Sequence, residues 1–193
     1  MLKDSILTQA SACQKLIAFR TEKQEWGETI IGYVKSVTTE LITINEIDEY
    51  GLPIGTTTFR LDDLIDIMID DKTLSCLEIL ESKNKQLSPA KSFTFWGNSV
   101  DIRKYILARM KEGKPIVLFV EDGDTNDTNI IGLIAAVDDI SVMIDLIDRY
   151  GEKDGKIIVP LNTITGIRWN GQEDVARWLL YENRYKKNVS DKQ

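Results

Sequence analysis

The stretch IIGYVKSVTTELITINEIDEYG, residues 30–51, returns one hundred positions later as IIGLIAAVDDISVMIDLIDRYG, residues 130–151. Without a gap, the match extends over residues 16–67 and 116–167 and holds thirteen identical pairs in fifty-two positions, Phe19 over Phe119 among them. Chance would give about three or four identical pairs over this length. The chain is therefore interpreted as a tandem duplication of one small module.

Five apolar runs in each copy have the pattern of short strands. Within each run, apolar residues either alternate with polar ones or follow one another directly, and turn residues lie at both ends of the run. Glycines such as Gly51 and Gly151 fit the positive φ of a hairpin loop between the third and fourth strands. The predicted strands cover residues 16–22, 29–37, 42–49, 56–61 and 64–69 in the first copy, and residues 116–121, 129–137, 140–149, 156–161 and 164–169 in the second.

Helices are predicted on both sides of each set of strands. The leading helices cover residues 2–14 and a segment that starts after Ser99 as N-cap and ends at Gly113. The closing helices cover residues 73–82 and 172–187. The sequence thus predicts a first helix-plus-barrel repeat over residues 1–84, a linker over 85–98, and a second repeat with a C-terminal helix over 99–193. The linker aromatics Phe93, Phe95 and Trp96 are expected to pack on folded structure, because they are too apolar for water.

A helix followed by five short strands with this apolar spacing resembles the Sm-like (LSm) family of small SH3-like barrels. Gly32 and Gly132 match the glycine of the family's first motif, and Asp138 matches its aspartate. Neither copy has the asparagine of the RNA-reading loop, and the second motif, Ile-Arg-Gly-Asp, survives only as Arg60 and Asp62. The resemblance implies a mainly β, α+β chain of two tandem five-stranded barrels. It also implies RNA or nucleotide binding through the barrel loops.

Composition restricts the function further. The chain has 193 residues with a net charge of −7, no histidine and two cysteines without metal-site spacing. Mechanisms that need histidine as a base or ligand are excluded, and the acidic charge opposes binding to a phosphate backbone. No apolar run reaches the length of a membrane span. We therefore expect a cytoplasmic, non-enzymatic protein with no membrane association, no cofactor and no metal.

Several side chains are candidate binding residues. Carboxylate and aromatic pairs recur in both copies at Asp48, Tyr50, Asp148 and Tyr150, where they suit either a polar ligand or the turn itself. Acidic loops, including Asp122, Asp124 and Asp127, are interpreted as solvated rather than as oxygen ligands for a cation. On the closing helix, three aromatics at helical spacing form either a packing face or a docking edge. The complete candidate set is Arg60, Asp62, Asp138, Asp139, Tyr50, Tyr150, Trp178, Tyr181 and Tyr185.

Three classes of function follow from these observations. The first is a non-catalytic interaction or scaffold module that binds protein or assembles with itself, because small barrels expose strand edges. The second is RNA or nucleotide binding, which the resemblance implies. The third is an acidic inhibitor or immunity-type protein that covers a basic surface. Charge favours the first half for such a role: residues 1–86 hold 9 basic and 15 acidic side chains, net −6, against net −1 for residues 87–193.

Overall fold

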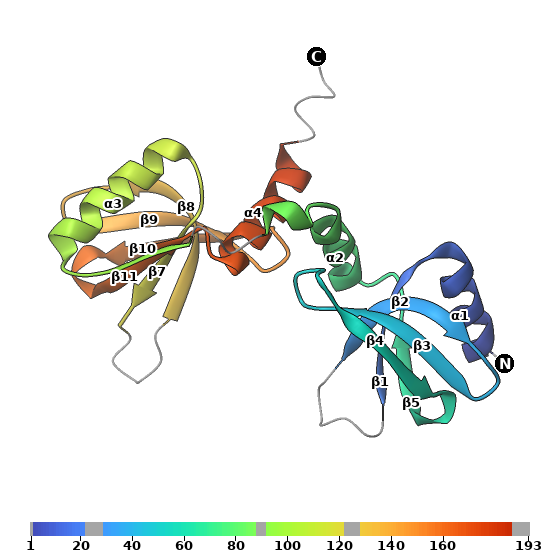
Figure 1. Cartoon of the computed structure of the whole chain (residues 1–193). Helices are drawn as coiled ribbons and strands as arrows, with labels where there is room; N and C mark the ends of the chain where they lie inside the picture. The colour runs from blue at the N-terminus through green and yellow to red at the C-terminus, as the bar shows by residue number, and fades with distance from the viewer. Residues whose placement is uncertain (1, 22–28, 88–91, 122–127, 187–193) are drawn as a thin grey trace, which may run out of the picture. The chain divides into compact units, whose positions relative to one another are not determined.

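The chain divides into two compact units, residues 1–84 (unit 1) and residues 85–193 (unit 2), each with its own sheet and core (Figure 1). The computed structural model describes residues 2–21, 29–87, 92–121 and 128–186. Among these residues, no helix is long and apolar enough to cross a membrane.

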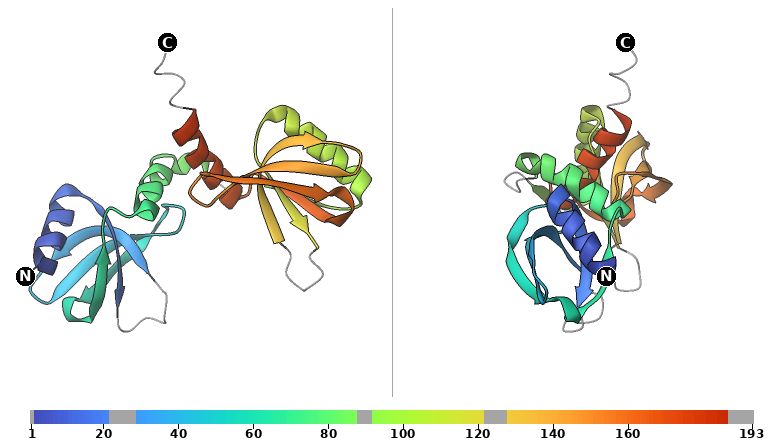
Figure 2. Two further views of the ribbon diagram at one scale, coloured as in Figure 1. Left: turned by 180° about the vertical axis from the view of Figure 1, so that it is seen from behind. Right: turned by 90° about the vertical axis from the view of Figure 1, so that its right-hand side faces the viewer.

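Unit 1 is one antiparallel sheet with two helices, and its strands have the order β4-β3-β2-β1-β5. Its core combines Leu7 and Ala10 of the first helix with alternate residues of the strands, such as Ile42 and Ile44. Figure 2 shows these strands curving around the core. The elements are α1 (Leu2–Cys13), β1 (Leu16–Thr21), β2 (Ile30–Val37), β3 (Leu41–Ile47), β4 (Pro53–Arg60), a 3-10 turn (Leu61–Asp63), β5 (Leu64–Met68) and α2 (Lys72–Ser82).

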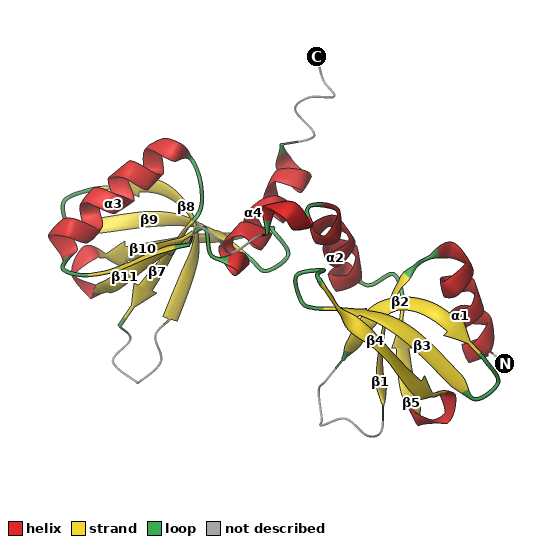
Figure 3. Ribbon diagram, in the orientation of Figure 1, coloured by secondary structure: helices red, strands yellow, loops and turns green. Residues whose placement is uncertain are grey.

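Unit 2 repeats this order of elements, as the labelled strands β7 to β11 show (Figure 3). It adds one strand, β6, so that its sheet has the order β10-β9-β8-β7-β11-β6. Its core contains Ile102 and Ile106 of the leading helix, packed against the strands. The elements are β6 (Phe93–Trp96), α3 (Ser99–Glu112), β7 (Ile116–Val120), β8 (Thr128–Val137), β9 (Ser141–Ile147), β10 (Lys153–Pro160), a 3-10 turn (Leu161–Thr163), β11 (Ile164–Trp169) and α4 (Gln172–Tyr185); a further 3-10 turn lies at Asn84–Gln86.

The prediction of two tandem five-stranded barrels was wrong. The fold is α+β with two open antiparallel sheets, of five and six strands, and four α-helices in the described residues. Within those residues no ladder joins β4 to β5, and the outer neighbour of β11 is β6 rather than β10. The reason is physical: alternation of apolar residues predicts which face of a strand is buried, but it does not predict which edges meet.

The gapless alignment of the two copies was also wrong, at the first strand. Ile17 pairs with Gly32, whereas Ile116 pairs with Gly132. Equivalent residues are therefore 99 positions apart in β1 and β7 (116 − 17) and 100 apart from β2 and β8 onward (132 − 32). A shift of one residue moves every side chain of a strand to the opposite face.

Phe19 and Phe119 consequently lie in different environments, although they aligned as an identical pair. Phe19 is fully buried and corresponds to Leu118, which is also fully buried. Phe119 corresponds instead to Arg20, on the other face of the sheet. The identity at this position was therefore a coincidence of register.

The start of α3 differs from the prediction by one residue. Asn98 is the N-cap, and its side-chain oxygen accepts hydrogen bonds from the backbone N–H groups of Val100 and Asp101, both at 3.1 Å. The helix ends at Gly113, whose φ of 61° lies in the left-handed region that glycine tolerates. Asparagine and serine are both good N-caps, which is why the sequence favoured the neighbouring Ser99.

Candidate functional site

The carboxylate and aromatic pairs shared by the two copies shape turns. Asp48 Oδ1 accepts hydrogen bonds from the backbone N–H groups of Tyr50 at 2.9 Å and Leu52 at 2.8 Å. Asp148 makes the same two bonds, to Tyr150 at 2.9 Å and to Glu152 at 2.7 Å. These carboxylates are therefore committed to the loop between the third and fourth strands, and the tyrosines beside them are half-buried.

The candidate residues Asp138 and Asp139 lie at another turn, between β8 and β9. Asp138 Oδ1 accepts from the N–H groups of Ile140 and Ser141 at 2.9 and 2.6 Å, and these bonds lower the pKa of its carboxyl. Asp139 is almost fully exposed and pairs with Arg103 at 3.0 Å. Asp138 therefore builds the β8–β9 turn, and it does so without requiring a ligand.

Arg60 precedes the 3-10 turn of unit 1, and Asp62 lies within it. The arginine Nη2 and the aspartate Oδ2 lie 3.9 Å apart, and both side chains are exposed. An exposed ion pair at this distance is worth little. The structure therefore places these two residues together on a surface turn rather than in a cleft.

The three aromatics of α4 do form one cluster. Trp178 and Tyr181 stack with ring centroids 5.5 Å apart, and Tyr181 lies 4.7 Å from Tyr185. Lys186 Nζ lies 4.3 Å from the Trp178 ring, and Lys153 Nζ lies 5.2 Å from the Tyr185 ring. All three aromatics are half-buried, so the cluster is partly a packing face between α4 and the rest of unit 2.

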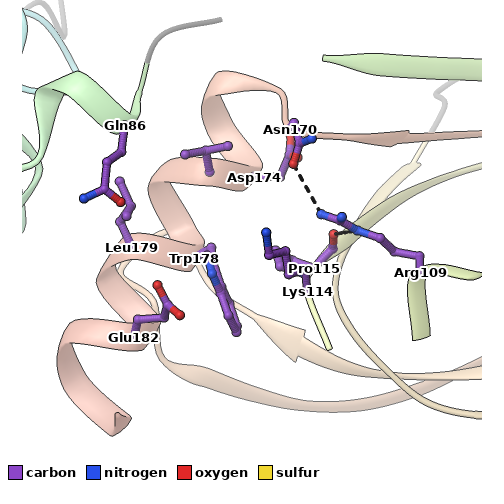
Figure 4. A pocket seen from close by; sticks show the side chains of 10 residues that line it. Gln86, Arg109, Lys114, Pro115, Asn170, Asp174, Trp178, Leu179 and Glu182 are labelled. Atoms are coloured by element: carbon purple, nitrogen blue, oxygen red, sulfur yellow. Dashed lines mark hydrogen bonds between the residues drawn. The ribbon is translucent and has the colours of Figure 1, made fainter. Parts of the chain in front are cut away.

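A cavity of about 310 Å³ in unit 2 lies between the end of α3, the start of β7 and α4 (Figure 4). Its buried Arg109 donates to the Pro115 carbonyl at 3.0 Å and to Asn170 Oδ1 at 3.4 Å. Asp174 accepts from the Gly171 N–H at 3.0 Å, and burial raises the pKa of its carboxyl, against the positive charge of Arg168. The cavity is lined by two basic side chains, Arg109 and Lys114, and two acidic ones, Asp174 and Glu182, so its formal charges balance.

The exposed apolar side chains point to a different kind of site, the edges of the sheets. Along the outer strands, Ile54 of β4 is 65% exposed and Ile158 of β10 is 66% exposed. On β5 and just after it, Ile65, Met68 and Ile69 are 56%, 39% and 40% exposed. Edge strands present unpaired backbone donors and acceptors, which another chain can pair with.

The corresponding edge of unit 2 is covered by β6. Residues 93–96 pair antiparallel with β11, with Phe95 opposite Ile167 and Trp96 opposite Gly166. Phe93 stacks on Trp169 at 4.2 Å, and Trp96 stacks on Phe119 at 4.6 Å. The linker aromatics therefore pack on folded structure, as predicted, but as an additional strand rather than as a surface connection.

Gly166 makes room for this strand. A Cβ atom at this position would lie 2.4 Å from Cε3 of Trp96, far inside van der Waals contact. The sequence contained one signal for β6, the alternation of Phe93, Thr94 and Phe95, but a run of four residues before a helix also has the length of a linker. Sequence reasoning therefore anticipated exposed strand edges but named no residue of β5 or β6 as a binding residue.

Metal coordination has no support in the described parts of the chain, where no group of three or more Cys, Asp or Glu side chains gathers as ligands would. Asp122, Asp124 and Asp127 lie outside those parts.

Comparison with known proteins adds no further assignment. No protein-family model matches the chain, and no curated protein has a significantly similar sequence. The fold and the edges of its sheets are therefore the basis for a functional proposal.

Proposed function

We propose that the chain is a non-catalytic interaction module that binds protein at the edges of its two sheets. The observation that carries this proposal is β6 on β11: one outer edge of this fold already holds an additional antiparallel strand, whereas the equivalent edge, β5, has no partner among the described residues. A strand added to a sheet edge gains affinity from main-chain hydrogen bonds and specificity from alternate side chains.

The exposed apolar residues support the same reading. Ile65, Ile54 and Ile158 are each more than half exposed and all lie on strands at the outside of a sheet. An apolar side chain on an edge strand lies beside unpaired backbone donors and acceptors, where a strand of another protein can pair. The alternatives are binding to RNA or nucleotide, assembly with further copies of the chain, and inhibition of a basic enzyme, and one experiment separates them.

The experiment is site-specific photo-crosslinking in cells that produce the full chain. A benzophenone amino acid replaces Ile65 on β5 or Ile158 on β10. The matched control replaces Val100, which is 66% exposed but lies on α3. The proposal predicts protein adducts from the two edge positions and none from the control.

The composition of the adducts decides between the alternatives. An adduct with a different protein supports the proposal, and mass spectrometry of that protein tests whether it is a basic enzyme. Adducts that contain only this chain indicate self-assembly. Adducts that ribonuclease removes, or the absence of adducts at both edge positions, would contradict the proposal.

A further inference from the structure

We propose that the outer edge of β5, at residues 66–69, binds an extended antiparallel segment of a partner protein with the pattern aromatic, any residue, aromatic, then lysine or arginine. This inference rests on the proposed function, protein binding at sheet edges. It goes further by naming the edge, the direction of the bound strand and the chemistry of the residues that the edge selects.

Unit 2 provides the geometric template. In β11, Gly166, Ile167, Arg168 and Trp169 face Trp96, Phe95, Thr94 and Phe93 in turn. The equivalent residues of unit 1 are Asp66, Ile67, Met68 and Ile69, because Ala18 pairs with Met68 as Val117 pairs with Arg168. A segment bound to β5 in the same register therefore places its first aromatic opposite Ile69 and its second opposite Ile67.

The exposure of these residues fits an unoccupied edge. Ile167, which pairs with Phe95 of β6, is fully buried in the core, whereas its equivalent Ile67 is only partly buried. Met68 and Ile69 are 39% and 40% exposed. At the other end of the strand, Lys3 Nζ donates to the Leu64 carbonyl at 2.6 Å, so the chain's own side chain already occupies that acceptor. Among the residues that the structure describes, none therefore occupies the β5 edge where unit 2 binds β6.

The fourth position of the bound segment must differ from the template. In unit 2 this position is Trp96, which lies over Gly166 and stacks on Phe119. In unit 1 the same two places hold Asp66 and Arg20. Arg20 Nε donates to Asp66 Oδ2 at 2.9 Å, while Asp66 Oδ1 accepts no hydrogen bond in the described residues and the side chain is 35% exposed. A carboxylate oxygen without a donor at this edge favours lysine or arginine over tryptophan at the fourth position.

Charge argues for a foreign segment rather than a second copy of β5. Five aspartates lie within residues 62–71, on both sides of the strand and inside it. Two β5 strands could pair antiparallel about a two-fold axis in two central registers. With Asp66 on the axis, Asp66 faces its own copy. With Ile67 on the axis, Asp63 faces Asp71. Like charges directly opposite one another are destabilising. A segment that carries positive charge gains attraction at the same places.

The test is a titration of the full chain with short labelled peptides, followed by fluorescence anisotropy. The lead peptide is Ser-Phe-Thr-Phe-Lys-Gly, which keeps the β6 pattern and places lysine opposite Asp66. Its matched control carries glutamate in place of lysine, and a second control carries proline in place of threonine, which removes a backbone donor. We expect the lysine peptide to bind at least about tenfold more tightly than the glutamate peptide, the factor for one charge-assisted hydrogen bond.

Two variants of the chain locate the effect. Asp66→Asn should reduce the preference for lysine over glutamate to about twofold or less, because the charge at the orphan acceptor is lost. Asp62→Asn removes one exposed charge from the same acidic run and should leave the preference within about twofold of the original, since the exposed position is screened. If Asp66→Asn does not fold, hydrogen exchange on the unaltered chain replaces it: the lysine peptide must slow exchange at residues 66–69.

Three results would overturn the inference: no saturable binding of the lysine peptide up to about 1 mM, equal binding of the lysine and glutamate peptides, or slowed exchange elsewhere than at β5. A dimer of the free chain that the lysine peptide dissociates would also overturn it, because a second copy would then occupy the edge. If crosslinks from Ile65 still capture a different protein, the proposed function stands and only the sequence of the partner segment is wrong.

Discussion

At the scale of single residues, two glycines that are identical in the two copies maintain the fold. At Gly32 and Gly132, a Cβ atom would lie 2.3 and 2.2 Å from the backbone oxygens of Asn45 and Asp145. Backbone oxygens cannot rotate away, so both copies need glycine where β2 meets β3 and β8 meets β9. Repetition of these glycines in both copies therefore indicated shared architecture. The candidate binding edge, in contrast, is a feature in which the two copies differ.

Gly132→Ala should destabilise unit 2 by about 2–3 kcal/mol, because the new methyl group must displace backbone. Gly55→Ala is the matched control, since a Cβ atom there meets nothing within 4 Å. It should change stability by less than about 0.5 kcal/mol. Urea unfolding of both variants measures the difference, and equal midpoints would contradict the steric explanation.

Asp174 should make the stability of unit 2 depend on pH. Burial raises the pKa of its carboxyl above the ordinary value of 3.8, so the folded state holds the proton to higher pH than the unfolded chain does. Its contribution is fully present below about pH 3.8 and is lost as pH rises through the folded pKa. The free energy of unfolding of Asp174→Asn, relative to that of the unaltered chain, should therefore be higher at pH 7 than at pH 4.

Urea unfolding at the two pH values measures this comparison. Asp62→Asn serves as the control, because it makes the same chemical change at an exposed side chain. The raised pKa of Asp174 would be contradicted by a stability difference between Asp174→Asn and the unaltered chain that is the same at both pH values. A difference that changes with pH in the opposite direction would contradict it as well.

At the scale of elements, periodicity predicted the strands well and their pairing poorly. Alternation located β3 and β9 because one face of each is buried, with Ile42, Ile44, Val142 and Ile144 all 1% exposed or less. The closure of the sheets, the one-residue shift of β1 and the pairing of β6 depend on contacts between distant segments. Such contacts leave no local pattern in the sequence. Asp66 was missed for the same reason, since its partner Arg20 is 46 residues away.

Removing an aromatic of β6 should loosen unit 2 at its outer edge. Phe95 packs on the core and on Tyr105, with ring centroids 4.8 Å apart. Phe95→Ser should cost about 2–4 kcal/mol of unit 2 stability and speed hydrogen exchange at residues 166–169. Thr94→Ser, at an exposed position of the same strand, is the control. Unchanged exchange at β11 would show that β6 contributes little to the edge.

At the scale of the whole molecule, the two units share an order of elements but differ in one edge and in charge. Unit 2 covers the edge of β11 with β6, and unit 1 surrounds the edge of β5 with aspartates. Repulsion between two such acidic edges opposes self-association. In 0.1 M salt this repulsion is screened at distances beyond about 10 Å. The duplication thus provides two related sheets: one holds its own additional strand, and the other is the one for which we propose a partner strand.

The full chain should therefore be a monomer of about 21.9 kDa at low salt. Light scattering coupled to size exclusion measures the mass, at low salt and again at about 1 M salt, where the Debye length falls to about 3 Å. Association that appears only at high salt is consistent with repulsion between acidic edges. A stable dimer or ring at low salt would favour self-assembly instead.

Hydrogen exchange compared between β5 and β11 tests the central claim most directly, because the chain contains its own reference. In the free protein, backbone amides of residues 66–69 that point away from β1 should exchange much faster than their equivalents at residues 166–169, which pair with β6. Adding the lysine peptide should slow exchange at residues 66–69 and leave residues 166–169 unchanged. Equal protection of the two edges in the free protein, or no change at β5 with the peptide bound, would contradict the claim that β5 is an open edge that receives a partner strand.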